Sequence, residues 1–302
     1  NKLSEYTNGS TTQLVNPDTF QWDKELIRKL GYPEDIFLPL QMPGTKVGQL
    51  LPEIQKEVGF DLEVVLCGSH DTASAVMAVP QTEGDGIYIS SGTWSLMGIE
   101  SLKPVITEDA AAANFTNEGG YDHRFRFLKN IMGLWMIQSV RHEYSDAYSF
   151  AQLCDMAEES KEFPSRVDVN DQSFLSPDSM VEAIRQYCHK TGQPVPESVG
   201  ELTSVVYRSL AQSYGETVRG LEKIAGKTYD SIHIIGGGSN AAYLNQLTAD
   251  ATRKTVYAGP GEATAIGNLL AQMIHAGDLT DLKSARKCVR ESFEIKTFAP
   301  AK

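Results

Sequence analysis

Hydrophobic side chains recur at two spacings along the chain, and these spacings predict both helices and strands. Between residues 202 and 221 they return every three or four positions until Gly226, which predicts a long helix packed along one face. Short apolar runs at 87–89, 94–99 and 231–235 predict β-strands. The mixture is typical of an α/β protein.

The segment from 231 to 258 predicts a β-strand, a helix and a second β-strand. Strand patterns at 231–235 and 255–258 flank a helical pattern at 241–251, and the turn after the first strand contains three glycines, Gly236 to Gly238. Such a turn lets the backbone approach a nucleotide closely, and the N-terminus of the next helix favours negative charge. An ordinary structural turn explains the glycines equally well, because Ala241 occupies the last position of the dinucleotide fingerprint.

Further helices are predicted at 22–30, 53–58 and 263–275. A strand pattern at 125–128 leads into another helix, which we expect to begin near Asn130. Asn130 is a candidate ligand contact, although capping this helix explains it equally well.

Composition and charge narrow the class of function. The 302 residues include 41% hydrophobic side chains and have a formal net charge of −12, so we expect packed domains and no nucleic-acid surface. No apolar run reaches the roughly 18 residues of a membrane span. The four cysteines are far apart, which favours reduced thiols in a cytoplasmic protein over a disulfide framework or a metal site. A polar segment at 81–85 predicts the boundary between two domains, 1–80 and 81–302.

The adjacent His70 and Asp71 carry the most informative chemistry in the sequence. They follow an apolar run at 62–67 that predicts a buried strand, and they precede an alanine-rich stretch that predicts a helix. In α/β enzymes such a junction commonly holds catalytic groups, and a carboxylate there can accept a proton from a bound hydroxyl. A capping aspartate beside a structural histidine is the alternative explanation.

A hydroxyl-rich hairpin tip is predicted at 90–93, where the sequence Ser-Ser-Gly-Thr separates two strand patterns. Hydroxyls and a flexible backbone suit phosphate oxygens, although an ordinary polar turn has the same composition. The P-loop pattern G-x-x-x-x-G-K-[ST] does not occur in the sequence, so this type of nucleotide site is not supported.

Taken together, these motifs resemble the FGGY carbohydrate kinases, in particular the members that act on L-rhamnulose. The resemblance covers nearly the whole chain. It depends most on four segments, which are 69–76 (SHDTASAV), 88–98 (YISSGTWSLMG), 116–120 (TNEGG) and 128–135 (LKNIMGLW).

The resemblance implies an actin/RNase H-like ATPase fold and ATP-dependent phosphorylation of the 1-hydroxyl of L-rhamnulose, with Mg²⁺ as cofactor. It implies that residues 1–80 are the C-terminal part of kinase domain I, including the catalytic loop, and that 81–302 are the ATP-binding domain II. The small-molecule partners are then the sugar and ATP, with no nucleic acid and no membrane. The implied site residues are Asp71 as the catalytic base, His70, Asp71, Thr72 and Asn130 at the sugar, and Thr93, Gln138 and Gly237 at ATP.

One departure from the family is the absence of its first phosphate-binding strand and loop, which have no counterpart from Asn1 onward. We therefore expect the start of domain I to be missing and this chain alone to have negligible kinase activity. The alternatives are a related kinase for L-fuculose, a pentulose or glycerol, a non-catalytic actin-like nucleotide-binding module, and a purely structural domain. The His70–Asp71 pair favours a kinase, because a sugar hydroxyl needs an orienting partner and a proton acceptor.

Overall fold

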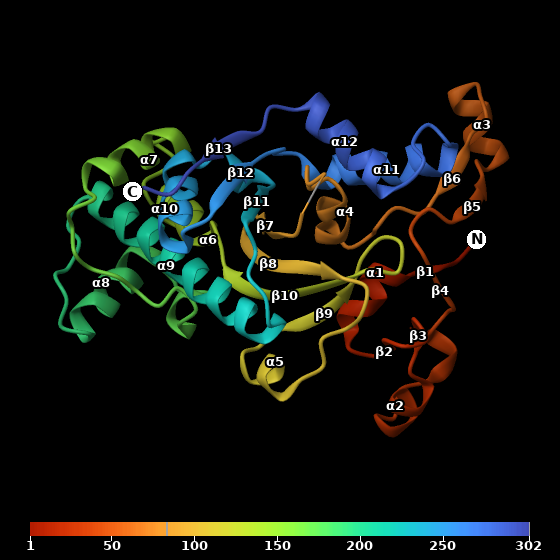
Figure 1. Ribbon diagram of the computed structural model, residues 1–302, viewed down its shortest axis with the longest axis horizontal. Coiled ribbons are helices and arrows are strands. Elements are labelled where there is room, and N and C mark those ends of the chain that lie inside the picture. Colours follow the sequence, from red (N-terminus) through yellow and green to blue (C-terminus); the bar gives the residue numbers. More distant parts are fainter. Residues whose placement is uncertain (83, 302) are drawn as a thin grey trace. The chain divides into compact units, whose positions relative to one another are not determined.

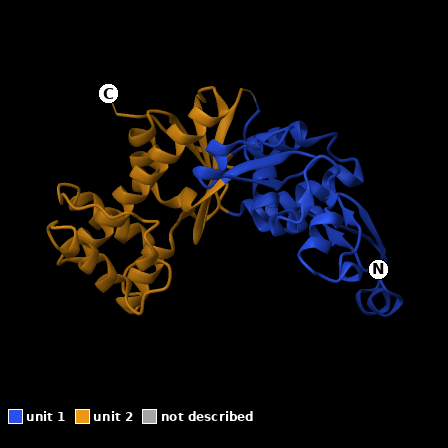
Figure 2. Cartoon of the chain, turned by 90° about the horizontal axis from the view of Figure 1, so that it is seen from below, with its two compact units in different colours: residues 1–82, 99–128, 262–292 blue, residues 83–98, 129–261, 293–302 orange. Residues whose placement is uncertain are grey.

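The computed structural model describes residues 1–82 and 84–301 and divides them into two compact units. Figure 1 shows the helices and strands, and Figure 2 colours the units blue and orange. Unit 1 consists of 1–82, 99–128 and 262–292, and unit 2 contains the described residues of 83–98, 129–261 and 293–302. The predicted division into domains 1–80 and 81–302 remains a prediction, since these units follow different ranges.

Unit 1 is built from short elements that come from three stretches of the chain. Strands β1 and β4 pair in parallel, while β2 with β3 and β5 with β6 form antiparallel pairs. Helix α11 packs against α4 and α12. The elements are β1 (Ser4–Glu5), α1 (Tyr6–Gly9), η1 (Ser10–Thr12), β2 (Val15–Asn16), β3 (Gln21–Trp22), α2 (Lys24–Lys29), η2 (Glu34–Ile36), β4 (Leu40–Gln41), β5 (Lys46–Gln49), α3 (Pro52–Val58), β6 (Glu63–Val65), α4 (Asp71–Met77), α5 (Glu108–Ala112), β9 (Thr116–Gly119), α11 (Ala263–Ala276) and α12 (Leu282–Ser292).

The largest sheet has seven strands in the order β13-β12-β11-β7-β8-β10-β9. Strands β7, β11 and β12 are parallel, and β13, β8 and β9 each pair antiparallel with a neighbour. The chain passes between the units within β8 (Trp94–Ser101) and β10 (Phe125–Met132). The remaining elements, all in unit 2, are β7 (Gly86–Ser91), α6 (Trp135–Glu143), α7 (Phe150–Glu159), η3 (Gln172–Phe174), α8 (Met180–Lys190), α9 (Val199–Ala225), β11 (Ser231–Ile235), η4 (Gly237–Asn240), α10 (Ala242–Thr252), β12 (Thr255–Ala258) and β13 (Lys296–Phe298).

The predicted long helix is confirmed as α9, which packs against α7 and α10 (Figure 1). Ser198 and Glu201 form a capping box at its start, and Gly226 ends it with a positive φ of 67°. All six apolar positions of the predicted face are at most 2% exposed, namely Leu202, Val206, Leu210, Tyr214, Val218 and Leu221. The predicted unit at 231–258 is also confirmed, because β11 and β12 pair in parallel around α10.

The predicted helix start near Asn130 is wrong. Strand β10 continues to Met132, and α6 begins only at Trp135. The strand is buried at most of its positions, so it lacks the alternation that marks a half-exposed strand. A Cβ on Gly133 would lie 2.5 Å from the carbonyl carbon of Trp94, so the chain passes close to the 90–94 hairpin before it turns into the helix.

The apolar run at 62–67 also differs from its prediction as a buried strand. Only Glu63–Val65 form a strand, β6, and its three residues are partly exposed because β6 pairs with β5 in a two-stranded sheet. The predicted helix at 22–30 is shorter than expected, since Trp22 belongs to β3. Within the described residues, no helix has the length and apolar character that crossing a membrane requires.

Candidate functional site

His70 and Asp71 lie where the loop after β6 enters α4. His70 precedes the helix with an extended backbone (φ −74°, ψ 119°), and Asp71 is the first helical residue. The Ser74 hydroxyl donates to the carbonyl of Gly68 at 2.7 Å and so closes the loop onto the helix. A Cβ on Gly68 would lie 3.2 Å from the Ser74 amide nitrogen, which explains a glycine at this close approach. The predicted helix after Asp71 is therefore confirmed.

The Asp71 carboxylate is the exposed group at this junction, with 79% of its side chain accessible. Its Oδ1 accepts hydrogen bonds from the Thr72 amide at 2.6 Å and from the Thr72 hydroxyl at 3.3 Å. No donor to Oδ2 is found in the part of the chain that the structure describes. Thr72 itself is 4% exposed, so it supports the carboxylate from the buried side. One carboxylate oxygen thus remains available to accept a proton.

His70 is mostly buried beside a charged pair. Its side chain is 22% exposed, and its Nδ1 lies 3.8 Å from Asp71 Oδ1 and 3.4 Å from Arg126 Nη2. Burial, followed by the positive charge of Arg126, lowers the pKa of the imidazole below 6.5. The carboxylates of Glu118, Asp71 and Glu5 act in the opposite direction. Burial and Arg126 therefore favour the neutral form of His70.

A buried carboxylate fixes the loop that carries His70. Glu5 is 8% exposed and accepts hydrogen bonds from the Ser69 amide at 3.1 Å and the Ser69 hydroxyl at 2.6 Å. It also accepts from the Thr7 amide at 2.8 Å, and the Thr7 hydroxyl oxygen accepts from the His70 amide at 3.2 Å. Residues at the start of α1 thus set the position of a loop more than sixty residues later.

Three charged residues of this region were missed from the sequence, namely Glu5, Glu118 and Arg126. Glu118 and Arg126 are register partners on β9 and β10. The sequence signal for Glu118 and Arg126 is a charged residue within a short strand segment. Arg126, for example, stands among apolar residues at 125–128, which indicates that it is buried. For Glu5, no local pattern distinguishes this carboxylate from a surface one.

In unit 2, the tip of the β7–β8 hairpin joins the start of α6. The carbonyl oxygen of Gly92 accepts from the Leu134 amide at 2.9 Å, and that of Thr93 accepts from the Trp135 amide at 3.2 Å. Thr93 is exposed, and Gln138 lies within the first turn of α6, where its amide donates to the Leu134 carbonyl at 2.8 Å. The predicted ATP contacts Thr93 and Gln138 therefore belong to one local arrangement.

The glycine turn after β11 packs against the end of β7. A Cβ on Gly236, whose φ is 82°, would lie 2.9 Å from the Ser91 carbonyl oxygen, and one on Gly238 would lie 2.0 Å from the Ser91 hydroxyl. A Cβ on Gly237 would meet nothing within 4 Å. Close packing thus requires the outer two glycines, whereas Gly237 between them is exposed and its backbone is open to a ligand.

The predicted residues fall into two groups. His70, Asp71 and Thr72 lie together in unit 1, while Thr93, Gln138 and Gly237 lie around one hairpin tip in unit 2. Asn130 belongs to unit 2, on β10, where it is exposed between the half-buried Lys129 and the buried Ile131. It caps no helix, so the alternative explanation for this residue does not hold. The roles of all seven residues remain predictions.

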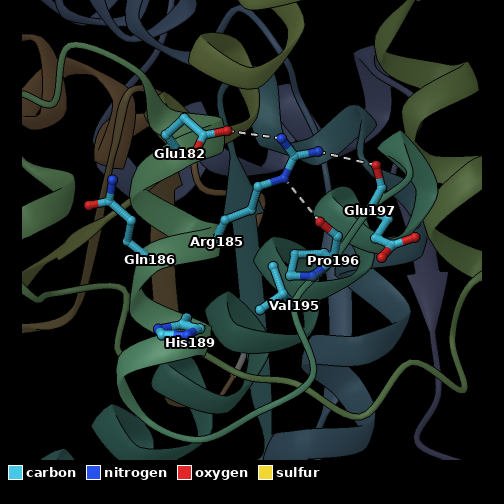
Figure 3. Close-up of a pocket in the computed structure, with 7 residues that line it drawn as sticks. All are labelled: Glu182, Arg185, Gln186, His189, Val195, Pro196 and Glu197. Atoms are coloured by element: carbon cyan, nitrogen blue, oxygen red, sulfur yellow. Dashed lines mark hydrogen bonds and ion pairs between the residues drawn. The ribbon is translucent and has the colours of Figure 1, made fainter.

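A different surface pocket lies on α8 in unit 2 (Figure 3). It has a volume of about 470 Å³. Its central cation, Arg185, donates to Glu182 at 2.9 Å and to the carbonyl oxygens of Pro196 at 3.1 Å and Glu197 at 3.2 Å. The guanidinium is engaged in the fold, so this pocket is a weaker candidate than the two groups above.

The described residues contain no cluster of three or more His, Cys, Asp or Glu side chains that could hold a metal ion. None of these residues is therefore assigned as a ligand of Mg²⁺.

Comparison with known proteins relates both parts of the chain to one family. Residues 1–78 match the N-terminal domain of the FGGY family of carbohydrate kinases, and 87–276 match its C-terminal domain. The chain is 51% identical over 300 residues to a rhamnulokinase of Halalkalibacterium halodurans and 46% identical over 301 residues to one of Bacillus subtilis. Each match covers 99% of this chain, but it spans only 64% and 62% of those two proteins.

Solved structures agree on the fold. A glycerol kinase of Plasmodium falciparum with ADP superposes with a TM-score of 0.73, and a ligand-bound xylulose kinase of Lactobacillus acidophilus with 0.72. Both proteins are 15% identical to this chain. Each match covers 99% of this chain, 59% of the glycerol kinase and 60% of the xylulose kinase. The predicted two-domain, actin-like α/β fold is thus confirmed. On the evidence of both family matches, this chain belongs to the FGGY carbohydrate kinases.

Proposed function

We propose that the protein transfers a phosphoryl group from ATP to the 1-hydroxyl of L-rhamnulose. The high identity to proteins named rhamnulokinase over 99% of this chain supports the substrate. The observation that carries the chemistry is the exposed Asp71 carboxylate, which has one oxygen without a donor among the described residues and lies next to a histidine whose pKa is lowered.

Asp71 acts in this proposal as the general base. Phosphoryl transfer needs in-line positioning, an acceptor for the proton of the attacking hydroxyl and neutralisation of phosphate charge. The free oxygen of Asp71 takes the proton as the sugar oxygen attacks the γ-phosphorus and the bond to ADP breaks. His70 and Asn130 are the proposed sugar contacts. Thr72, the third proposed residue of the sugar site, acts through its hydrogen bonds to Asp71.

ATP is proposed to bind at the hairpin tip and the glycine turn of unit 2. Thr93 supplies an exposed hydroxyl, and Gly237 supplies an exposed backbone, where an added Cβ would meet none of the described residues within 4 Å. Gln138 lies in the first turn of α6, and its amide donates to the carbonyl of Leu134, whose own amide binds the hairpin tip at Gly92. Mg²⁺ is proposed to arrive with the ATP phosphates, where it neutralises their charge. We assign it no protein ligand.

Residues 1–80 are proposed as the C-terminal part of domain I and 81–302 as the ATP-binding domain II. This division agrees in outline with the ranges of the two family matches, 1–78 and 87–276. A cytoplasmic location without nucleic-acid or membrane partners is also proposed. Its support is the acidic composition and the four free cysteines.

A phosphorylation screen tests the proposal. The full-length polypeptide that contains these residues is assayed with ATP and Mg²⁺ against L-rhamnulose, L-fuculose, D-xylulose and glycerol, with the 302-residue chain in parallel. We expect the highest kcat/KM for L-rhamnulose and negligible turnover by the 302-residue chain. Preference for another acceptor would transfer the assignment to a related kinase, and ATP binding without any phosphorylated product would favour the non-catalytic module.

A further inference from the structure

The largest fully buried side chain in the described residues is a cation, Arg126. It lies on β10 opposite Glu118 of β9, and its Nη2 is 3.0 Å from Glu118 Oε2. Its Nε donates to the carbonyl oxygen of Gly119 at 2.9 Å. All three residues belong to unit 1. The guanidinium is therefore held by two groups on the neighbouring strand.

Stability alone is a poor explanation for this ion pair. Two apolar side chains of similar volume commonly replace a buried ion pair without loss of stability, because burying both charges carries a large desolvation penalty. In addition, Nη1 of Arg126 is buried without a hydrogen-bond partner among the described residues. A buried donor left in this state is unfavourable. The pair therefore calls for a function besides packing.

The remaining contact of the guanidinium indicates what that function is. Arg126 Nη2 lies 3.4 Å from Nδ1 of His70. A guanidinium has donors and no acceptor, so Nδ1 must present its lone pair, and the single proton of the neutral ring is then on Nε2. The lowered pKa of His70 agrees with a neutral ring.

We propose that Arg126 is a positioning residue that holds His70 as the neutral tautomer with its proton on Nε2. His70 then offers a hydrogen-bond donor, rather than a cation, to an oxygen of the bound sugar. Because Nδ1 carries no proton, it cannot donate to Asp71 Oδ1 at 3.8 Å, and the carboxylate keeps its capacity as a base. The donor role toward the sugar depends on the function proposed above, whereas the tautomer does not.

Arg126 and Glu118 shift the pKa of His70 in opposite directions, which makes the test specific. Arg126 lowers the pKa of His70, and the carboxylates that face the ring, Glu118, Asp71 and Glu5, raise it. Removing Glu118 alone should therefore lower the pKa of His70 further. Removing Arg126 together with Glu118 should raise it, because Arg126 has the larger effect of the two. A general loss of structure would shift both variants toward the pKa of a solvated histidine.

The experiment is a pH titration of the full-length polypeptide, labelled with [¹⁵N]histidine and followed by long-range ¹H–¹⁵N spectra. His70→Gln identifies the signal of His70. We expect the Nε2–H tautomer in the unsubstituted protein with a midpoint below pH 6.5, a lower midpoint in Glu118→Gln, and a higher midpoint with mixed tautomers in Arg126→Met/Glu118→Gln. In the double variant, KM for L-rhamnulose should rise about 10-fold with kcat changed by less than about 3-fold, as for the loss of one uncharged hydrogen bond.

An Nδ1–H tautomer, or a protonated His70 at pH 7, in the unsubstituted protein would overturn the inference even if the double variant fails to fold. Equal midpoints in the three proteins would also overturn it. If L-rhamnulose is not phosphorylated at all, the proposed function fails, and the spectra still decide the state of His70. An unchanged KM in an active double variant would refute the donor role.

Discussion

Replacement of Gly267 by alanine tests whether the contact between α11 and α4 keeps Asp71 in position. Gly267 is buried in α11, and a Cβ there would lie 1.8 Å from the carbonyl oxygen of Ser74 in α4. It would also lie 2.4 Å from the Ser74 carbonyl carbon, so the obstacle is helix backbone and no rotation of a side chain relieves it. The helices would have to separate by about 1.5 Å to reach ordinary van der Waals contact.

The expected loss of stability follows from two opposing effects. Overpacking a close contact costs about 1–3 kcal/mol, whereas alanine in place of glycine inside a helix contributes about 1 kcal/mol. Because the clash is with backbone, we expect the overpacking cost of Gly267→Ala to lie near the upper end of that range. The net destabilisation is then about 2 kcal/mol. A displacement of α4 also moves Asp71, and misplacing a catalytic group by about 1 Å can reduce kcat about 100-fold.

Gly220→Ala is the matched control, since Gly220 lies inside α9 and a Cβ there would meet nothing within 4 Å. Urea denaturation followed by circular dichroism, together with kcat of the full-length polypeptide, compares the two variants. Gly220→Ala should be as stable as the unsubstituted protein or slightly more stable, with normal kcat. If Gly267→Ala also had an unchanged urea midpoint and normal kcat, the packing argument would be refuted.

Two further predictions concern the glycine turn and an exposed ion pair. Gly238→Ala should lower the urea midpoint, because its Cβ would lie 2.0 Å from the Ser91 hydroxyl. Gly237→Ala should leave the urea midpoint unchanged and weaken ATP binding measured by calorimetry. The reverse pattern would contradict the proposed site. The hydrogen bond of His275 to Glu63 raises the pKa of His275 above 6.5. Its contribution to stability is therefore complete below pH 6.5 and is lost as pH rises through the higher folded-state pKa. The difference in urea midpoint between the unsubstituted protein and His275→Gln should shrink as pH rises, and a difference that grows would contradict this account.

Elements with a strong local pattern could be predicted from the sequence. The bounds of β11 and β12 follow from their apolar runs, and α9 follows from its periodicity and its terminal glycine. The end of β10 could not be predicted, because the position at which the strand gives way to α6 depends on how closely Gly133 approaches the hairpin near Trp94. That approach joins residues about forty positions apart, which no local pattern reports.

The residues of the candidate site also divide into those with a local sequence pattern and those without one. His70 and Asp71 were found because an apolar run, two polar residues and an alanine-rich helix follow one another. The groups that hold them, Glu5 and Arg126, were missed because their contacts cross 64 and 56 positions of sequence. A charge among apolar residues, such as Arg126, indicates burial, but only the fold shows which groups surround the buried charge.

The central claim is that the carboxylate of Asp71 accepts the proton of the sugar hydroxyl. The most direct measurement is kcat of full-length Asp71→Asn with ATP, Mg²⁺ and L-rhamnulose, alongside calorimetric titration with ATP. We predict a kcat lower by about 10² to 10⁴ with ATP affinity unchanged, because the amide keeps the size of the side chain and loses its basicity. A kcat equal to that of the unsubstituted enzyme would contradict the account.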